Sequence, residues 1–143
     1  MSTFASVEAL LAHARAGLDR LVPSEAYEAV AAGARLVDIR PQWQRVADGE
    51  IPGSLVVERN HLEWRLHPAS DARLPQAVEG QRWIVVCTEG YTSSLAAASL
   101  NSIGVEAADV VGGLHAWRAA GLPVVPGGTP VEHLVHDATR GAA

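Results

Sequence analysis

Short apolar segments alternate with helix-forming segments four or five times along the chain, and this alternation restricts the fold more than any other feature. Buried strands are predicted where short, mostly apolar runs lie between turn-forming residues, at 34–40, 55–57, 83–86 and 107–111. Strands that alternate with helices form a parallel sheet covered by helices on both faces. At 143 residues, the chain has room for one such α/β domain with its own core.

The helices are predicted from apolar spacing and capping residues. Ser24 is expected to cap the first helix of the domain, with Ala26, Tyr27, Val30 and Ala31 facing inward and Gly33 at its end. Further helices are expected at 41–47, 59–65, 92–102 and 114–120, with a short one within 66–81 and an edge strand at 21–23.

The domain is expected to span 21–125, with one segment before it and one after it. Within 1–20, apolar residues recur at helical spacing after Ser6, a good N-cap. This amphipathic helix is expected to pack on its own domain, a dimer contact being the alternative. Residues 126–143 are rich in Gly and Pro and then polar, which predicts a loosely held tail.

Composition narrows the functional class. The net charge of −5 argues against binding to nucleic acid or an anionic membrane. All 11 basic residues are arginines, so an anion site must use guanidinium groups or backbone amides. No apolar run is long enough for a membrane span, and the N-terminus lacks a secretory pattern, so a cytoplasmic protein is expected. His133 and His136 lack a third ligand nearby, so no metal site is expected.

The only cysteine, Cys87, stands where the apolar strand 83–86 ends, and a helical segment begins about five residues later. A tight turn between a strand and a helix directs backbone N–H groups and the positive end of the helix dipole toward one point. A thiol at that point is favoured as the nucleophilic thiolate. The alternative is a buried structural cysteine that acts as a small hydrophobic side chain.

Two further pairs of charged residues follow predicted strands. Asp38 and Arg40 end the strand 34–40, where ligands bind in open α/β sheets, and a structural ion pair that ties adjacent loops is the favoured alternative. Arg59 and Arg65 follow the strand 55–57. They are either clamps for an anion or the solvated face of a helical turn.

These features together resemble a single-domain rhodanese, a member of the rhodanese-like sulfurtransferase family, over residues 20–125. The resemblance lies in the order and spacing of four motifs: Leu36-Val37-Asp38-Ile39-Arg40, Gly49-Glu50-Ile51-Pro52-Gly53-Ser54, Cys87-x-x-Gly90, and Gly112-Gly113 followed by Trp117 and Gly121-x-Pro123. It implies a central five-stranded parallel sheet with helices on both faces. It also implies a ping-pong reaction that needs no cofactor.

By resemblance, Cys87 takes a sulfane sulfur from a donor such as thiosulfate or a persulfide and becomes a persulfide itself. The sulfur then passes to an acceptor such as cyanide, a thiol or an acceptor protein. The substrate-binding residues are expected in the loop and at the two arginines, with Asp38 and Arg40 in support: Thr88, Glu89, Gly90, Tyr91, Thr92, Ser93, Arg59 and Arg65.

Several loop residues depart from the family pattern. Thr88 and Thr92 stand where many members have arginine, and Glu89 adds a negative charge to a loop expected to receive an anion. Phosphatases and arsenate reductases of related fold need an arginine at the position of Ser93, six residues after the cysteine. A non-catalytic interaction or sulfur-carrier module is the alternative to a sulfurtransferase.

Overall fold

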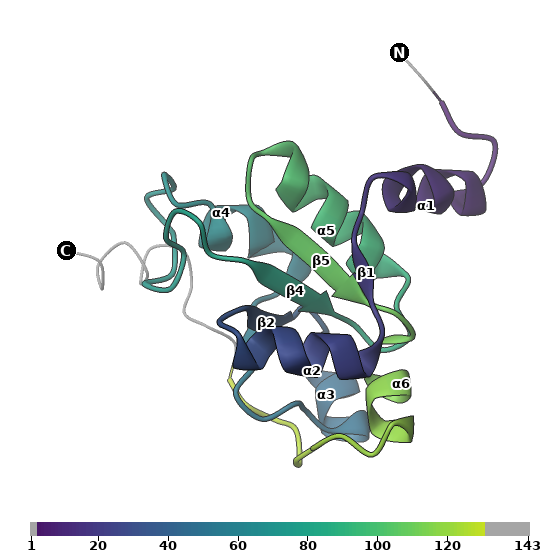
Figure 1. Ribbon diagram of the computed structural model, residues 1–143, viewed down its shortest axis with the longest axis vertical. Helices are drawn as coiled ribbons and strands as arrows, with labels where there is room; N and C mark the ends of the chain where they lie inside the picture. Colours follow the sequence, from purple (N-terminus) through teal and green to yellow (C-terminus); the bar gives the residue numbers. More distant parts are fainter. Residues whose placement is uncertain (1–2, 131–143) are drawn as a thin grey trace.

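The computed structural model describes residues 3–130, and at its centre is a five-stranded parallel sheet (Figure 1). The strands lie in the order β1-β5-β4-β2-β3, and each pair of neighbours is parallel. Their bounds are β1 Arg20–Leu21, β2 Arg35–Asp38, β3 Leu55–Val56, β4 Trp83–Val86 and β5 Ala107–Val110. The predicted α/β class and five-stranded parallel sheet are therefore confirmed.

Helices cover both faces of the sheet, as expected for parallel strands. One core contains residues of α4 and α5, and the core on the opposite face contains residues of α2 and α6. The helices are α1 Val7–Ala16, α2 Pro23–Ala31, α3 Gln42–Asp48, α4 Leu62–Leu66, α5 Thr92–Ser102 and α6 Gly113–Ala119, with a 3₁₀ turn at Arg59–His61. Among the described residues, no helix has the length and apolar character needed to cross a membrane.

Strand β4 lies between β5 and β2, and all four of its residues are buried. Trp83 and Val85 face the core that contains α5, while Ile84 and Val86 face the core that contains α2 and α6. The continuous apolar run of this strand follows from burial on both faces. Because parallel strands end at the same edge, β4 delivers Cys87 to the edge where Asp38 ends β2.

Three local predictions were wrong. Helix α2 begins at Pro23 with Val22 as its N-cap, and Pro at N1 explains the early start. Tyr27 and Val30 are exposed rather than inward because they line an open apolar cavity of about 360 Å³ between α2 and Trp117. Residues 67–82 form turns without a helix, since two prolines and Gly80 interrupt the segment.

Helix α1 begins after Ser6, whose side chain accepts a hydrogen bond from the N–H of Ala9 at 3.0 Å, as predicted. It packs against α5, yet none of its residues is fully buried, and the side chain of Val7 is 65% exposed. Helix α1 therefore contacts the domain through one side only. Hydrogen bonds from Arg15 to the start of α5 and to the loop before it strengthen this contact.

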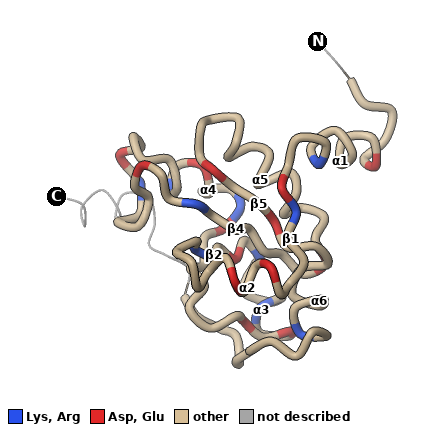
Figure 2. The backbone as a smooth tube through the Cα atoms, viewed as in Figure 1, with Lys and Arg blue, Asp and Glu red and all other residues tan. Residues whose placement is uncertain are grey.

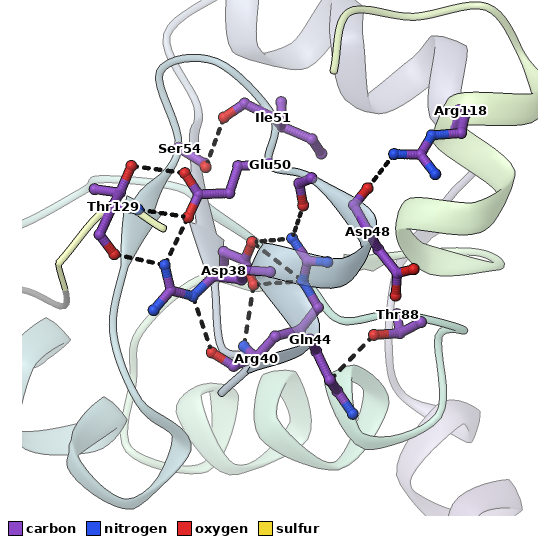
Figure 3. Close-up of polar contacts among 12 residues, drawn as sticks. Asp38, Arg40, Gln44, Asp48, Glu50, Ile51, Ser54, Thr88, Arg118 and Thr129 are labelled. Atoms are coloured by element: carbon purple, nitrogen blue, oxygen red, sulfur yellow. Dashed lines mark hydrogen bonds and ion pairs between the residues drawn. The ribbon is translucent and has the colours of Figure 1, made fainter. Parts of the chain in front are cut away.

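A buried polar cluster ties the loops after β2 together (Figure 3). The guanidinium of Arg40 forms an ion pair with Asp38 at 2.7 Å and donates to the carbonyl of Gly49 at 2.7 Å. Nearby, Glu50 accepts hydrogen bonds from Arg45 at 2.6 Å and from the hydroxyl of Thr129 at 2.6 Å. Asp38 and Glu50 are therefore both held in place by arginine side chains of the same cluster.

The contacts of Thr129 also bear on the predicted loose tail. Arg45 donates to the Thr129 carbonyl at 2.6 Å, and Val125 pairs with Glu50 in an antiparallel bridge. The first part of the tail is thus bonded to the domain. Residues 131–143, including His133 and His136, lie outside the described residues.

We expect the attachment of this segment to depend on pH. Burial raises the pKa of Glu50, but hydrogen bonds from Thr129 and Arg45 and the charge of Arg45 outweigh it, so the pKa lies below 4.5. A lowered pKa stabilises the fold above the unfolded value, and this stabilisation is lost as the pH falls through the folded value. Glu50→Gln should therefore lower the free energy of unfolding at pH 7 by about 1–3 kcal/mol.

The difference between wild type and Glu50→Gln should shrink as the pH falls below about 4.3, the usual pKa of an unfolded Glu, because the unfolded chain then takes up a proton before the folded one does. Urea unfolding at pH 7 and at pH 3.5 measures it. A difference that stays the same at both pH values would show that the charge of Glu50 does not contribute.

Candidate active site

Cys87 directly follows β4, at the carboxyl edge of the sheet, and its side chain is 5% exposed. The loop 88–91 connects it to α5. This is the arrangement of strand, short loop and helix that the sequence predicted around the only thiol. After β2 the chain continues to β3 on one side, and after β4 it continues to β5 on the other side; open α/β sheets bind ligands where the connections part in this way.

Gly90 brings a backbone donor to the sulfur. Its N–H donates to Sγ of Cys87 at 3.2 Å. Its φ is +87°, and an added Cβ would lie 2.8 Å from the nitrogen of Gly112, so a side chain at this position would be both strained and crowded. The loop can therefore fold back over the thiol only with glycine here.

Other N–H groups at the loop lack a hydrogen-bond acceptor among the described residues. Among the described residues, no acceptor is recorded for the N–H groups of Glu89, Tyr91, Thr92 and Ser93. The helix α5 begins at Thr92, as expected, but its N-cap residue is Tyr91 and no side chain caps it, so Thr92, Ser93 and Ser94 do not act as caps. Uncapped N–H groups at a helix N-terminus favour an anion.

The two serines are used elsewhere. The hydroxyls of Ser93 and Ser94 each donate to Oδ2 of the buried Asp109 at 2.8 Å. Asp109 lies in β5 and also accepts two hydrogen bonds from Arg20, at 3.0 and 3.2 Å. The predicted ligand Ser93 therefore presents its backbone to the loop and directs its hydroxyl to Asp109.

Helix α6 supports the loop from behind. The N–H of Leu114 donates to the carbonyl of Cys87 at 2.8 Å, and the N–H of His115 donates to that of Thr88 at 3.1 Å. Gly113 permits this approach, since a Cβ there would overlap the Cys87 carbonyl oxygen. Thr88 also donates from its hydroxyl to Oε1 of Gln44 in α3 at 3.1 Å (Figure 3). These bonds fix the backbone that carries the thiol.

Two loop side chains point outward. The ring of Tyr91 is 60% exposed, and Glu89 is exposed as well. An exposed carboxylate two residues from the thiol repels anions only weakly, because water and salt screen it. The expectation that Glu89 affects the choice of donor stays a prediction.

The two arginines predicted as anion clamps already have partners. Arg59 forms an ion pair with Glu63 at 2.9 Å, and the buried Arg65 donates to the carbonyl of Ala72 at 2.8 Å. Burial raises the pKa of Glu63, but hydrogen bonds from Ser99, its own backbone and Arg59 outweigh it and lower the pKa. The carboxylate thus stays charged beside Arg59. A role in substrate binding stays a prediction for both arginines.

The structure adds residues that sequence reasoning missed. Arg15 and Arg20 both donate to the carbonyl of Gly90, Asp109 holds the two serines, and Gln44 accepts from Thr88. Only Asp109 had a signal in the sequence, as a charged residue inside an apolar strand. No group of three His, Cys, Asp or Glu residues that could hold a metal occurs in the part of the chain described.

The fold and this loop define an α/β protein with a cysteine at the carboxyl edge of a parallel sheet, and comparison with known proteins identifies the family. The model of the rhodanese-like domain matches residues 22–120. The chain therefore belongs to the rhodanese-like family, and its N-terminal helix lies outside the matched region. None of the curated proteins compared with the chain matches it.

Solved structures agree with this assignment. A protein of unknown function from Rhodopseudomonas palustris, described as a possible tyrosine phosphatase, is 30% identical with a TM-score of 0.77, covering 87% of this chain and 97% of that one. A rhodanese-related protein from Thermoplasma volcanium is 24% identical with a TM-score of 0.61, covering 75% of this chain and 97% of that one. Thiosulfate sulfurtransferase from Pseudomonas aeruginosa is 24% identical with a TM-score of 0.68. The match covers 93% of this chain and 25% of the sulfurtransferase chain.

Proposed function

We propose that this protein is a sulfurtransferase that carries a sulfane sulfur on Cys87. The observation that supports this proposal is the loop around the thiol. The N–H of Gly90 faces the sulfur at 3.2 Å, and four neighbouring N–H groups have no acceptor among the described residues. Such a loop suits a soft sulfur anion, because oriented amides stabilise it without a charged ligand.

The proposed reaction has two steps. In the first, the Cys87 thiolate attacks the transferable sulfur of the donor, and a new S–S bond forms as the bond between that sulfur and the rest of the donor breaks. The rest of the donor leaves with the electron pair: as sulfite from thiosulfate, as a thiolate from a persulfide, or as the enolate of pyruvate, which then takes up a proton, from 3-mercaptopyruvate. In the second, a cyanide or thiolate acceptor attacks the outer sulfur of the persulfide and releases the Cys87 thiolate. No external oxidant or cofactor is needed.

The absence of a second cysteine limits how the persulfide can decay. With one thiol in the chain, the persulfide cannot be resolved as an internal disulfide. The sulfur must therefore leave to a separate acceptor, either a small molecule or an acceptor protein. A free reactive thiol of this kind suits a reducing compartment such as the cytoplasm.

The direct test is to offer thiosulfate, glutathione persulfide and 3-mercaptopyruvate in parallel and to measure intact mass. Treated protein should gain the mass of one sulfur atom, and cyanide should remove it. A comparison of the loading rates at low and high salt tests whether the exposed Glu89 affects the choice of donor, because salt screens its repulsion of an anionic donor. If no donor loads the protein, the interaction module becomes the better explanation.

We expect no phosphatase activity, although one similar structure is described as a possible tyrosine phosphatase. Binding of a phosphate dianion in such a loop needs a guanidinium six residues after the cysteine. Ser93 occupies that position, and its hydroxyl is bonded to Asp109 at 2.8 Å. Hydrolysis of p-nitrophenyl phosphate should not exceed that of the Cys87→Ser variant. Turnover that is lost only in that variant would contradict this assignment.

A further inference from the structure

The carbonyl oxygen of Gly90, in the active-site loop, accepts hydrogen bonds from two arginines of the N-terminal segment. Nη2 of Arg15, in α1, lies 2.7 Å from this oxygen, and Nη2 of Arg20, in β1, lies 3.0 Å from it. Both residues precede the region that matches the family domain, 22–120. Figure 2 shows basic residues in α1 and β1, the two elements that bring these side chains to the loop.

Gly90 connects these arginines to the sulfur. Its carbonyl accepts from the guanidinium groups, while its N–H donates to Sγ of Cys87 at 3.2 Å. The N–H and the carbonyl belong to the two peptide groups on either side of the Cα of Gly90, so bonds that anchor the carbonyl restrict the backbone rotations that would turn the N–H away from the thiol. The path through one residue also keeps the nearer guanidinium within about 10 Å of the sulfur.

The two arginines differ in how far their charge is neutralised. Arg20 forms a two-pronged ion pair with the buried carboxylate of Asp109. Arg15 has no carboxylate partner in the described part of the chain: its Nε donates to the hydroxyl of Ser94 at 3.0 Å, and its guanidinium lies 5.9 Å from the ring centre of Tyr91. Arg15 therefore brings a positive charge to a loop that has no basic residue of its own and whose one charged side chain is the exposed Glu89.

We propose that Arg15 is a positioning residue for Cys87, supplied by a helix outside the family domain. It anchors the carbonyl of Gly90, the residue whose N–H faces the sulfur, and provides positive charge that favours the thiolate and the persulfide anion. The inference rests on the proposed function, since it assigns this role for a reactive Cys87. Helix α1 would then contribute to the reactivity of Cys87 as well as packing on the domain.

The size of the effect follows from Coulomb's law. At about 9 Å and an effective dielectric constant of about 40–80, one unit charge changes the population of a thiolate by about two- to fivefold. Arg15→Gln should therefore slow alkylation of Cys87 by iodoacetamide at pH 7 by about two- to fivefold. Iodoacetamide is neutral, so the change reports the thiol rather than attraction of the reagent.

Two variants control for structure and for net charge. Arg15→Lys keeps the charge and one donor to Gly90, and its alkylation rate should stay within twofold of wild type. Arg35→Gln removes the same charge from the amino end of β2, at the opposite edge of the sheet, and should leave the rate unchanged. Thermal unfolding of each variant verifies that it is folded at the assay temperature.

A purely structural role would change the rate in the other direction. Because Cys87 is 5% exposed, loosening the loop would expose the thiol and speed its alkylation. A rate in Arg15→Gln that equals or exceeds that of wild type, or an Arg15→Lys variant as slow as Arg15→Gln, would overturn the proposal.

The wild-type protein offers a second measurement if Arg15→Gln does not fold. Raising the salt from about 20 mM to about 0.5 M screens the half-exposed guanidinium and should slow alkylation, whereas a rate independent of salt would overturn the proposal. Alkylation needs no sulfur donor. A protein that loads no sulfur would therefore contradict the proposed function and leave the test of Arg15 readable.

Discussion

Replacing Cys87 with serine should abolish sulfur loading and lower the rate of sulfur transfer by at least about a thousandfold. A serine hydroxyl is a poor nucleophile toward sulfur and cannot form a persulfide. Since Cys87 is the only cysteine in the chain, no other thiol can replace it. Intact mass after treatment with the best donor, together with the rate of thiocyanate formation from cyanide, measures both effects.

This variant should retain the fold, which makes the loss interpretable. Serine is slightly smaller than cysteine, and its oxygen can accept the hydrogen bond that the N–H of Gly90 gives to Sγ. The melting temperature of Cys87→Ser should therefore remain close to that of wild type. A folded Cys87→Ser variant that transfers sulfur at the wild-type rate would show that the sulfur is carried elsewhere.

The second large effect is expected on stability, from Asp38→Asn. Asp38 is fully buried and pairs with Arg40, which is 2% exposed. Nη1 of Arg40 already has no hydrogen-bond partner among the described residues, so the carboxylate is the main compensation for this buried charge. Removing one member of a buried ion pair leaves the other uncompensated, at a cost of roughly 3 kcal/mol.

Urea unfolding at pH 7 measures this change, and Glu106→Gln is its matched control. Glu106 pairs with Arg82 at 3.3 Å on the surface, where its side chain is 67% exposed. An exposed pair of this kind contributes at most about 1 kcal/mol. If Asp38→Asn proves no more destabilising than Glu106→Gln, the pair with Arg40 does not stabilise the loops after β2.

The sequence by itself determined the elements that depend on neighbours along the chain. The apolar run of β4 predicts a strand buried on both faces, and the alternation of strands and helices predicts a parallel sheet. The position of Cys87 between a strand and a helix follows from the same local pattern. Ser6 was also identified correctly as a cap, because its bond reaches only three residues along the chain.

The local sequence pattern could not decide the role of a residue when that role depended on a partner far away in the chain. The sequence leaves Asp38 and Arg40 open as ligands while favouring a structural ion pair, and the structure shows the ion pair. Tyr27 fits the inward stripe of a helix, but its exposure depends on where α2 meets Trp117. Helical spacing defines a face, whereas the tertiary arrangement decides what covers it.

Only the tertiary structure decided which charges surround the thiol. The bond from Arg15 to Gly90 spans 75 positions in the sequence, and the bond from Ser93 to Asp109 spans 16. The spacing of residues along a helix or strand carries no information about such contacts. They arise because α1 packs on α5 and because parallel strands place the ends of β1, β4 and β5 at one edge of the sheet. The position of the thiol at the end of a strand was therefore readable from the sequence, and its electrostatic surroundings were not.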